Sequence, residues 1–217
     1  MGCYASFPAL RIAKGFLSSE EGSVDIVHTE LSSLHMHPLK HSLEQLIIQS
    51  LFADGFIKYS VTCTPPKETP FWEITALYEE IIPASTQSMT WCCDDRGLSM
   101  TLAKEVPFLI VKTLPDHLKR LFHKASLAES TPCFYAIHPG GPKILSQIQS
   151  LLNLSEEAIY HSKEVFRSCG NMSSATLPHI WNLMLSDPNV PFGAHIVSLA
   201  FGPGLSISGG VFKKSRG

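Results

Sequence analysis

The sequence predicts an α/β fold in which helices cover β-sheets in layers. Short apolar runs of strand length recur along the chain, and segments with apolar residues at helical spacing lie between them. The chain has 217 residues, of which 44% are hydrophobic, enough for one domain or two tightly joined subdomains with a sizeable core. We find no internal repeat and no low-complexity linker in the sequence. A layered α/β architecture is therefore the expectation.

The first predicted helix starts directly after Cys3 and runs to about residue 17. Its apolar residues recur at helical spacing; they are Phe7, Leu10, Ala13, Phe16 and Leu17. Cys3 is therefore expected at or just before a helix N-terminus. A short strand over residues 24–30 follows this helix.

The second predicted helix starts at a capping box formed by Ser42 and Gln45. We expect its buried stripe to consist of Leu43, Leu46, Ile47 and Leu51, and Ala53-Asp54-Gly55 to end it. Residues 56–63 are predicted to form a strand that the following pair of prolines closes.

The remaining segments continue the alternation of strands and helices. Pro107 suits the first turn of a helix over residues 107–124, in which Pro115 is a candidate kink. The other predicted helices cover residues 143–152, 155–168 and 173–185. The predicted strands cover residues 72–81, 98–103 and 133–137, and a hairpin over residues 196–200 and 205–212 ends the fold. The basic residues 213–216 are expected to form a frayed, solvated terminus.

Charge and hydropathy exclude several classes of protein. The formal net charge is −2, which gives no electrostatic footprint for nucleic acid. No apolar run approaches the roughly 20 residues of a membrane span, and the N-terminal residues lack the pattern of a signal peptide. These features predict a cytoplasmic protein that binds neither nucleic acid nor membrane.

The six cysteines favour reduced thiols, because none forms a C-x-x-C pair and their spacing matches no zinc site or disulfide framework. His35, His37 and His41 cluster in the sequence, but no carboxylate or cysteine is spaced to complete a metal site with them. We therefore expect no metal and a solvated loop around these histidines.

Three residues together suggest covalent catalysis. Cys3 is expected at a helix start, where the macrodipole stabilises a thiolate, and a nearby histidine could stabilise it further through an ion pair. Such a thiolate can attack a thioester and hold its acyl group. His138 follows a predicted strand and Asn171 lies in a turn between helices, and both side chains can donate hydrogen bonds to a carbonyl oxygen that gains charge. Each residue alone also has a purely structural explanation, as a small buried thiol or a turn-forming asparagine.

Several segments resemble the chalcone and stilbene synthase family, the type III polyketide synthases. They occur in the family's order and extend over essentially the whole chain. The segments are GCYASFPALRIAK around Cys3, SLFADG around Phe52, FYAIHPGGPKIL around His138, CGNMSSAT around Asn171 and FGPGLSI from residue 201. In the last of these, Ala200 stands where the family has the first glycine of its loop.

The resemblance implies a thiolase-like layered fold and decarboxylative condensation of malonyl units onto a cysteine-bound starter. Cys3 would hold the growing chain. His138 would help to generate the thiolate and, with Asn171, would support malonyl decarboxylation. The implied substrates are malonyl-CoA and an acyl-CoA starter, with no further cofactor and no carrier protein. A homodimer is the assembly implied for the full-length enzyme.

The resemblance also points to residues that shape the substrate cavity. Phe52 matches a gatekeeper phenylalanine, and Ser173 matches a serine that lines the cavity. Met100 stands where plant enzymes have a second gatekeeper phenylalanine, so the cavity should differ from theirs. Ser32 and His35 fall where the family varies the residues that set cavity size and starter choice.

The family has roughly another half-chain before its cysteine, whereas this sequence begins two residues before Cys3. We expect residues 1–64 to be the end of the N-terminal thiolase-like half and residues 65–217 to be the C-terminal half. Four explanations for the missing half-chain are open: an internal methionine taken as the start, a broken gene, a partner chain that supplies the first half, or a self-sufficient short protein. Two other functions remain open. The protein is a non-catalytic remnant or a subunit that needs a partner, or it is a condensing enzyme of the initiating ketoacyl-acyl carrier protein synthase type.

Overall fold

A computed structural model provides the structure and describes residues 1–39, 42–95 and 97–217. His41 lies outside the described residues. The α-helices are α1 Ser6–Leu17, α2 Leu43–Leu51, α3 Val106–Lys124, α4 Pro142–Leu152, α5 Tyr160–Cys169 and α6 Thr176–Ser186, and the 3-10 helices are η1 Gly2–Tyr4, η2 Ser32–His35, η3 Glu157–Ile159 and η4 Ser173–Ala175. The strands are β1 Ser23–Glu30, β2 Gly55–Thr62, β3 Phe71–Ile81, β4 Met89–Asp94, β5 Gly97–Leu102, β6 Cys133–Ile137, β7 His195–Gly202 and β8 Ser206–Ser215.

The central sheet has the strand order β3-β8-β7-β6. β3 and β7 both run antiparallel to β8, whereas β6 runs parallel to β7. The chain between β6 and β7 contains α4, α5 and α6, as a parallel pair requires a long crossover. β7 is buried on both faces: Val197 and Leu199 pack in one cluster, and Ile196 and Ala200 in the other. This explains why the strand is a continuous apolar run instead of an alternating one.

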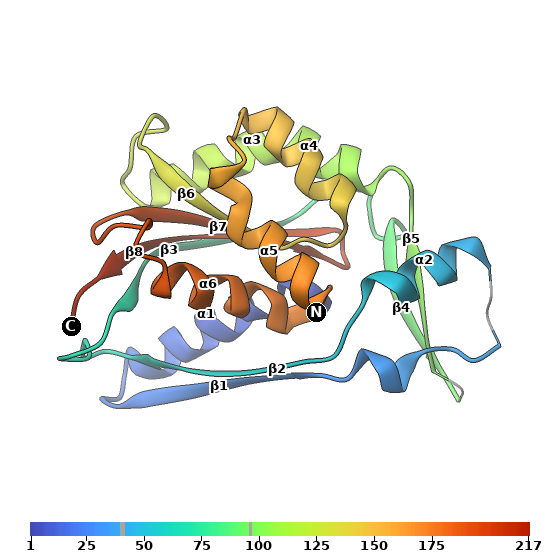
Figure 1. The fold of residues 1–217 in the computed structure, drawn as a ribbon, viewed down its shortest axis with the longest axis horizontal. Helices are drawn as coiled ribbons and strands as arrows, with labels where there is room; N and C mark the ends of the chain where they lie inside the picture. The colour runs from blue at the N-terminus through green and yellow to red at the C-terminus, as the bar shows by residue number, and fades with distance from the viewer. Residues whose placement is uncertain (40–41, 96) are drawn as a thin grey trace.

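Figure 1 shows the layers on the two sides of this sheet. α3 and α4 cover one face, and α1 and α6 cover the other, where they separate the sheet from the antiparallel ribbon of β1 and β2. The two core clusters match this arrangement, since α3 and α4 contribute to the first, and α1, α6, β1 and β2 to the second. The predicted layered α/β fold is therefore confirmed.

A side lobe consists of α2 and the hairpin β4–β5, which extend beyond one end of the sheet (Figure 1). The sequence analysis did not identify β4. The expected buried stripe of α2 was wrong: Leu43 is 74% exposed and Leu46 and Ile47 are also exposed, whereas Gln45 and Ile48 are buried. Because α2 packs against β5 through Gln45, whose Nε2 donates to the Met100 carbonyl at 2.7 Å, the opposite face of the helix is inside.

Other expectations about the helices differ in detail. The α3 helix continues through Pro115, and the predicted helix over 155–168 is divided into η3 and α5. Phe16 of α1 is exposed although it was assigned to the buried face. Within the described ranges, no helix combines the length and apolar character needed to cross a membrane.

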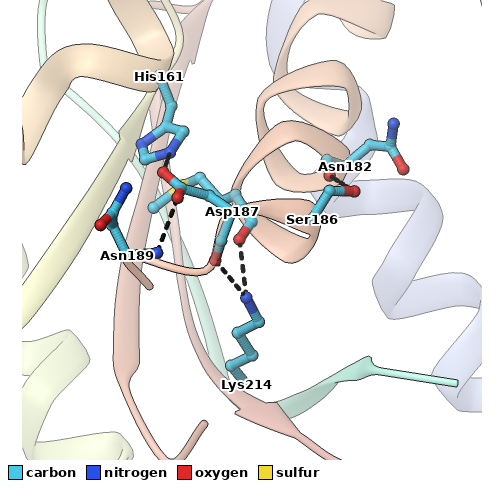
Figure 2. Close-up of polar contacts among 7 residues, drawn as sticks. His161, Asn182, Ser186, Asp187, Asn189 and Lys214 are labelled. Carbon is cyan, nitrogen blue, oxygen red and sulfur yellow. Dashed lines mark hydrogen bonds and ion pairs between the residues drawn. The ribbon is translucent and has the colours of Figure 1, made fainter. Parts of the chain in front are cut away.

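The basic C-terminal segment is part of the sheet, so the expectation of a frayed terminus was wrong. Lys214 of β8 is buried, and its Nζ donates to the carbonyl oxygens of Met184 at 3.2 Å and Asp187 at 2.8 Å (Figure 2). These carbonyls lie at the end of α6, where a cation is favoured by the helix dipole. The Asp187 carboxylate also accepts from His161 Nε2 at 2.7 Å, which connects α5 to the same point.

Candidate active site

Cys3 lies in η1, one turn before α1, and is only 5% exposed. η1 packs against β7 and against η4. Gly202 of β7 makes this contact possible, because a Cβ there would overlap the Tyr4 ring and lie 3.0 Å from the Met1 carbonyl oxygen. The lack of a side chain at Gly202 therefore allows η1, and with it Cys3, to pack closely against the central sheet.

Asn171 follows α5 and is held by its backbone to the end of α2. Its N–H donates to the Leu51 carbonyl at 2.8 Å and its carbonyl accepts from Ala53 at 2.9 Å, which gives a parallel bridge with Phe52. The sharp turn into Asn171 uses Gly170 at φ +74°. The predicted catalytic asparagine and the predicted gatekeeper are therefore neighbours.

The Asn171 side chain is oriented by its neighbour Ser173. Its Oδ1 accepts the Ser173 backbone N–H at 2.9 Å, so the amide NH₂ group is left to donate elsewhere. Both Asn171 and Ser173 hydrogen-bond to the Cys3 thiol. Ser173 has φ +49°, a conformation that costs a non-glycine residue about 1–2 kcal/mol. Such strain is common at functional sites, where the surrounding contacts enforce it.

His138 directly follows β6 and is 1% exposed. Its backbone N–H donates to Leu199 at 2.8 Å, which continues the pairing with β7. Neither ring nitrogen has a hydrogen-bond partner among the described residues. Buried polar groups are normally satisfied, so this imidazole has a free donor and a free acceptor for a ligand.

Burial dominates the electrostatics of both titratable groups. It raises the pKa of the Cys3 thiol to about 11, although the hydrogen bonds from Ser173 and Asn171 act in the opposite direction. It lowers the pKa of His138 to about 4. The thiol and the imidazole are thus both neutral at pH 7. Among the described residues no hydrogen bond joins the thiol to the imidazole, and burial disfavours the charged form of each.

A cavity of about 650 Å³ lies next to these residues, between the end of β1, α2 and the β4–β5 hairpin. All five residues that we expected to contact substrate line it. They are Ser32, His35, Phe52, Met100 and Ser173. Cys3, His138 and Asn171 do not line the cavity themselves, but Gly2 and Ser173 beside them do. The geometry thus brings Cys3 and Asn171 together and shows no hydrogen bond from either to His138.

Sequence reasoning missed several lining residues, of which Trp91 is the largest. Its ring meets Phe52 edge to face, with centroids 5.6 Å apart and planes at 78°. It belongs to β4, the strand that the sequence analysis did not identify, so no predicted element placed it near the site. Glu30 and Asp54 also line the cavity and bring two carboxylates to it.

The described residues hold no cluster of three or more histidine, cysteine, aspartate or glutamate side chains that could bind a metal ion. The candidate catalytic groups are a thiol, an imidazole and an amide. Together they suit covalent capture of an acyl group and donation to a carbonyl oxygen.

Comparison with known proteins shows which family the chain belongs to. Residues 73–215 match the family model of the chalcone and stilbene synthases, C-terminal domain. The chain belongs to the chalcone and stilbene synthase family. The resemblance seen in the sequence is thereby confirmed.

Both a curated sequence and a solved structure from Dictyostelium are similar to this chain. A probable polyketide synthase 1 of Dictyostelium discoideum is 31% identical in an alignment of 216 residues that covers 96% of this chain and 7% of that protein. The crystal structure of the C-terminal type III polyketide synthase domain of Steely1, a type I/III hybrid, superposes with a TM-score of 0.89 at 30% identity and covers 98% of this chain. The fold therefore matches a type III polyketide synthase domain.

A third match supports the fold alone. The structure of PKS-I from the brown alga Ectocarpus siliculosus gives a TM-score of 0.89 at 24% identity and covers 99% of this chain. The chain spans 60% of the Steely1 domain and 59% of the algal enzyme. The similarity therefore extends over only part of each of these two proteins.

Proposed function

We propose that this chain is the nucleophile-bearing part of a condensing enzyme that makes polyketides. In this proposal Cys3 carries the acyl starter and the growing chain, while His138 and Asn171 support decarboxylation of malonyl-CoA. Transfer of the starter to Cys3 releases coenzyme A. Condensation then forms a carbon–carbon bond between the acyl carbonyl carbon and the malonyl α-carbon, breaks the Cys3 thioester so that the thiol is regenerated, and releases CO₂, which leaves the extended chain on coenzyme A. The single observation that carries the proposal is the contact of the Cys3 thiol with Asn171 and Ser173, in a chain of this family.

The open hydrogen-bonding positions of His138 support its role. A thioester carbonyl would accept from the imidazole N–H and from the amide NH₂ of Asn171. When a ligand supplies the missing partner, the imidazole can also accept the thiol proton, which generates the nucleophile. Phe52, Met100, Ser173, Ser32 and His35 would then shape the space for the acyl chain.

The proposal includes the finer expectations from the resemblance. The substrates are malonyl-CoA and an acyl-CoA starter, no cofactor is needed beyond these thioesters, and the full enzyme is a cytoplasmic homodimer. Residues 1–64 complete an N-terminal half and residues 65–217 form the C-terminal half. The separation of the β1–β2 ribbon from the four-stranded sheet supports this division.

The direct test is acyl loading of the Cys3→Ala variant. We expect the native protein to gain the mass of an acyl group when it is incubated with acyl-CoA, and the variant to gain none. Undiminished covalent loading of the variant would remove Cys3 from the mechanism. Extension from malonyl-acyl carrier protein but not from malonyl-CoA would instead indicate a ketoacyl-acyl carrier protein synthase of the initiating type.

A second candidate function is that of a subunit that works only with a partner chain. The observation that favours it is the exposure of large apolar side chains, which gather before residue 60 in the described sequence; examples are Ile12, Phe16, Val27 and Phe56. Soluble proteins rarely leave such surface uncovered. A native mass well above 23.9 kDa, with a second polypeptide present, would support it. A single longer polypeptide would support the complete enzyme.

A further inference from the structure

The hairpin of β4 and β5 forms one wall of the cavity beside the candidate site. Trp91 of β4 and Met100 of β5 lie opposite each other in the hairpin, and both line the cavity. Phe52 lies next to them, edge to face with Trp91. The hairpin is a two-stranded sheet of its own, and such a hairpin is marginally stable in isolation. The position of this wall must therefore depend on contacts with other elements.

The helix α2 makes two hydrogen bonds to the backbone of β5 through adjacent residues. Gln45 Nε2 donates to the Met100 carbonyl at 2.7 Å, and Glu44 Oε1 accepts the Leu102 N–H at 3.2 Å. Residues two apart in a strand direct their backbone polar groups to the same side, so Met100 and Leu102 both present these groups to α2. The two side chains of α2 thus cover this edge of β5, as a neighbouring strand would.

The bond from Gln45 is the buried one of the two. Gln45 is 8% exposed and the Met100 residue that it contacts is 4% exposed. The Gln45 backbone N–H donates to Ser42 Oγ at 3.3 Å, which fixes the residue in the first turn of α2. A buried carbonyl that loses its donor is costly, so a Met100 carbonyl without Gln45 is satisfied only if β5 moves toward water. The bond therefore holds β5 in its inner position.

The same helix also connects the hairpin to the candidate catalytic residues. α2 contacts β5 at its first turn and ends at Phe52, its C-cap. Phe52 forms a parallel bridge with Asn171. Gln45 and Ile48, one turn apart on the inner face of α2, line the cavity between these two ends. The space between Asn171 and the hairpin wall is thus spanned by a single helix.

We propose that Gln45 is a positioning residue that holds β5 against α2, keeps Met100 and Trp91 at the cavity wall, and thereby limits the length of the acyl starter that the cavity accepts. The inference rests on the proposed function, in which the starter is transferred to Cys3. Gln45 acts through Met100 and does not contact the reacting atoms. Its polar side chain on the buried face of α2 is explained by this role.

The first test is the dependence of starter loading on chain length. Rates of acylation with hexanoyl-, octanoyl-, decanoyl- and dodecanoyl-CoA are measured by the mass of the acylated protein. Gln45→Met keeps the length of the side chain but removes the donor. We expect the ratio of the dodecanoyl rate to the hexanoyl rate to rise about tenfold or more, since one methylene in an apolar pocket changes discrimination by about 10- to 200-fold. A general loss of stability would lower all rates alike and leave this ratio unchanged.

Variants of the second hydrogen bond and a matched control complete the series. Glu44→Ala removes the acceptor for Leu102 and should raise the ratio by less than Gln45→Met does, whereas Glu44→Gln keeps an oxygen acceptor and should preserve the native ratio. Gln149 of α4 also donates its Nε2 to a backbone carbonyl, that of Leu154 at 3.3 Å, but it does not line the cavity. Gln149→Met should therefore leave the ratio at its native value. Circular dichroism verifies that each variant is folded.

The second test is hydrogen exchange in the absence of acyl-CoA. Exchange of the backbone amides of residues 97–102 should be faster in Gln45→Met than in the native protein, because β5 opens more often when its edge is not held. The same amides should exchange at the native rate in Gln149→Met. This measurement does not depend on acyl transfer.

The inference is overturned if folded Gln45→Met keeps the native chain-length ratio, whether or not its β5 exchanges faster, or if Gln149→Met changes the ratio equally. A failure of the proposed function has a different signature, because Cys3 of the native protein would then remain unmodified with every acyl-CoA. In that case the limit on chain length fails with it, and faster exchange in Gln45→Met would still support the role of Gln45 in holding the hairpin.

Discussion

At the scale of single residues, burial governs the ionisation of the candidate site. Cys3 and His138 are both neutral because burial disfavours their charged forms. The amide of Asn171 is already oriented, since Ser173 occupies its oxygen. The division of labour that we propose therefore predicts different consequences for the loss of each side chain.

Asn171→Ala should weaken malonyl decarboxylation more than starter loading. The variant loses the NH₂ donor for an oxygen that gains charge, a loss of roughly 100- to 1,000-fold for such groups, while the thiol that accepts the starter remains. Release of CO₂ from malonyl-CoA and the mass of the acylated protein measure the two steps separately. Equal losses in both steps would refute this division of roles.

Gly202→Ala should displace the segment that carries Cys3. The new Cβ would overlap the Tyr4 ring, so we expect a loss of about 1–3 kcal/mol in the free energy of unfolding and reduced acyl loading. Gly15→Ala is the matched control, because nothing lies within 4 Å of its Cβ position in α1 and alanine favours a helix by about 0.5–1 kcal/mol. Native stability and loading in Gly202→Ala would show that η1 does not depend on this glycine.

At the scale of secondary structure elements, Lys214 connects β8 to the end of α6 (Figure 2). Lys214→Met should lower the free energy of unfolding by about 1–3 kcal/mol, because the carbonyls of Met184 and Asp187 lose a charged donor in a buried position. Lys213→Met, one residue earlier on the same strand, should change it by less than about 0.5 kcal/mol. Chemical denaturation measures both; equal values would mean that the lysine ammonium does not stabilise this junction.

The neighbouring Asp187 should make the free energy of unfolding depend on pH in the acidic range. The backbone N–H of Asn189 and, to a lesser extent, His161 hold the pKa of Asp187 below its ordinary value of 3.8. Its contribution is therefore complete above that value and disappears as the pH falls through the lowered pKa. Unfolding curves of the native protein and of Asp187→Asn should differ at neutral pH and converge in strong acid. A difference that persists in strong acid would assign the effect to packing.

The sequence predicted most elements correctly where one physical pattern dominated. The apolar runs of β6, β7 and β8 and the periodic faces of α1 and α3 lie in the core. The prediction failed in the side lobe, where α2 packs against β5 through the polar residue Gln45. The apolar periodicity had predicted that the opposite face of this helix is buried. Lys214 was misjudged because a basic side chain near a terminus gives no local signal of a distant helix end.

The candidate site was predictable through its motifs, but its electrostatics were not. Five of the residues expected from the resemblance line one cavity and Asn171 hydrogen-bonds to Cys3, whereas His138 neither lines the cavity nor hydrogen-bonds to Cys3. The neutral states of Cys3 and His138 depend on burial, which the packing of β7, η1 and η4 creates and which no local pattern reveals. Hydrogen bonds connect the side chains of Tyr59, His28, Ser174 and Glu30, which come from β2, β1 and η4, so only the three-dimensional fold brings them together.

At the scale of the whole molecule, the layers explain why one surface is apolar. The ribbon of β1 and β2 lies outermost beyond α1 and α6 (Figure 1), and it carries exposed apolar residues such as Val27 and Phe56. A further layer on this ribbon would cover them, as in any fold in which a sheet packs on both faces. The candidate site meets this ribbon where η4, which carries Ser173, packs against β1.

The central claim is that Cys3 holds the acyl group, and peptide mass spectrometry of the native protein after brief incubation with an acyl-CoA tests it most directly. The account predicts an acyl group on the peptide that contains Cys3, and none on the peptides of the exposed Cys63 and Cys169. An unmodified Cys3, or acylation spread over the exposed thiols instead, would contradict it.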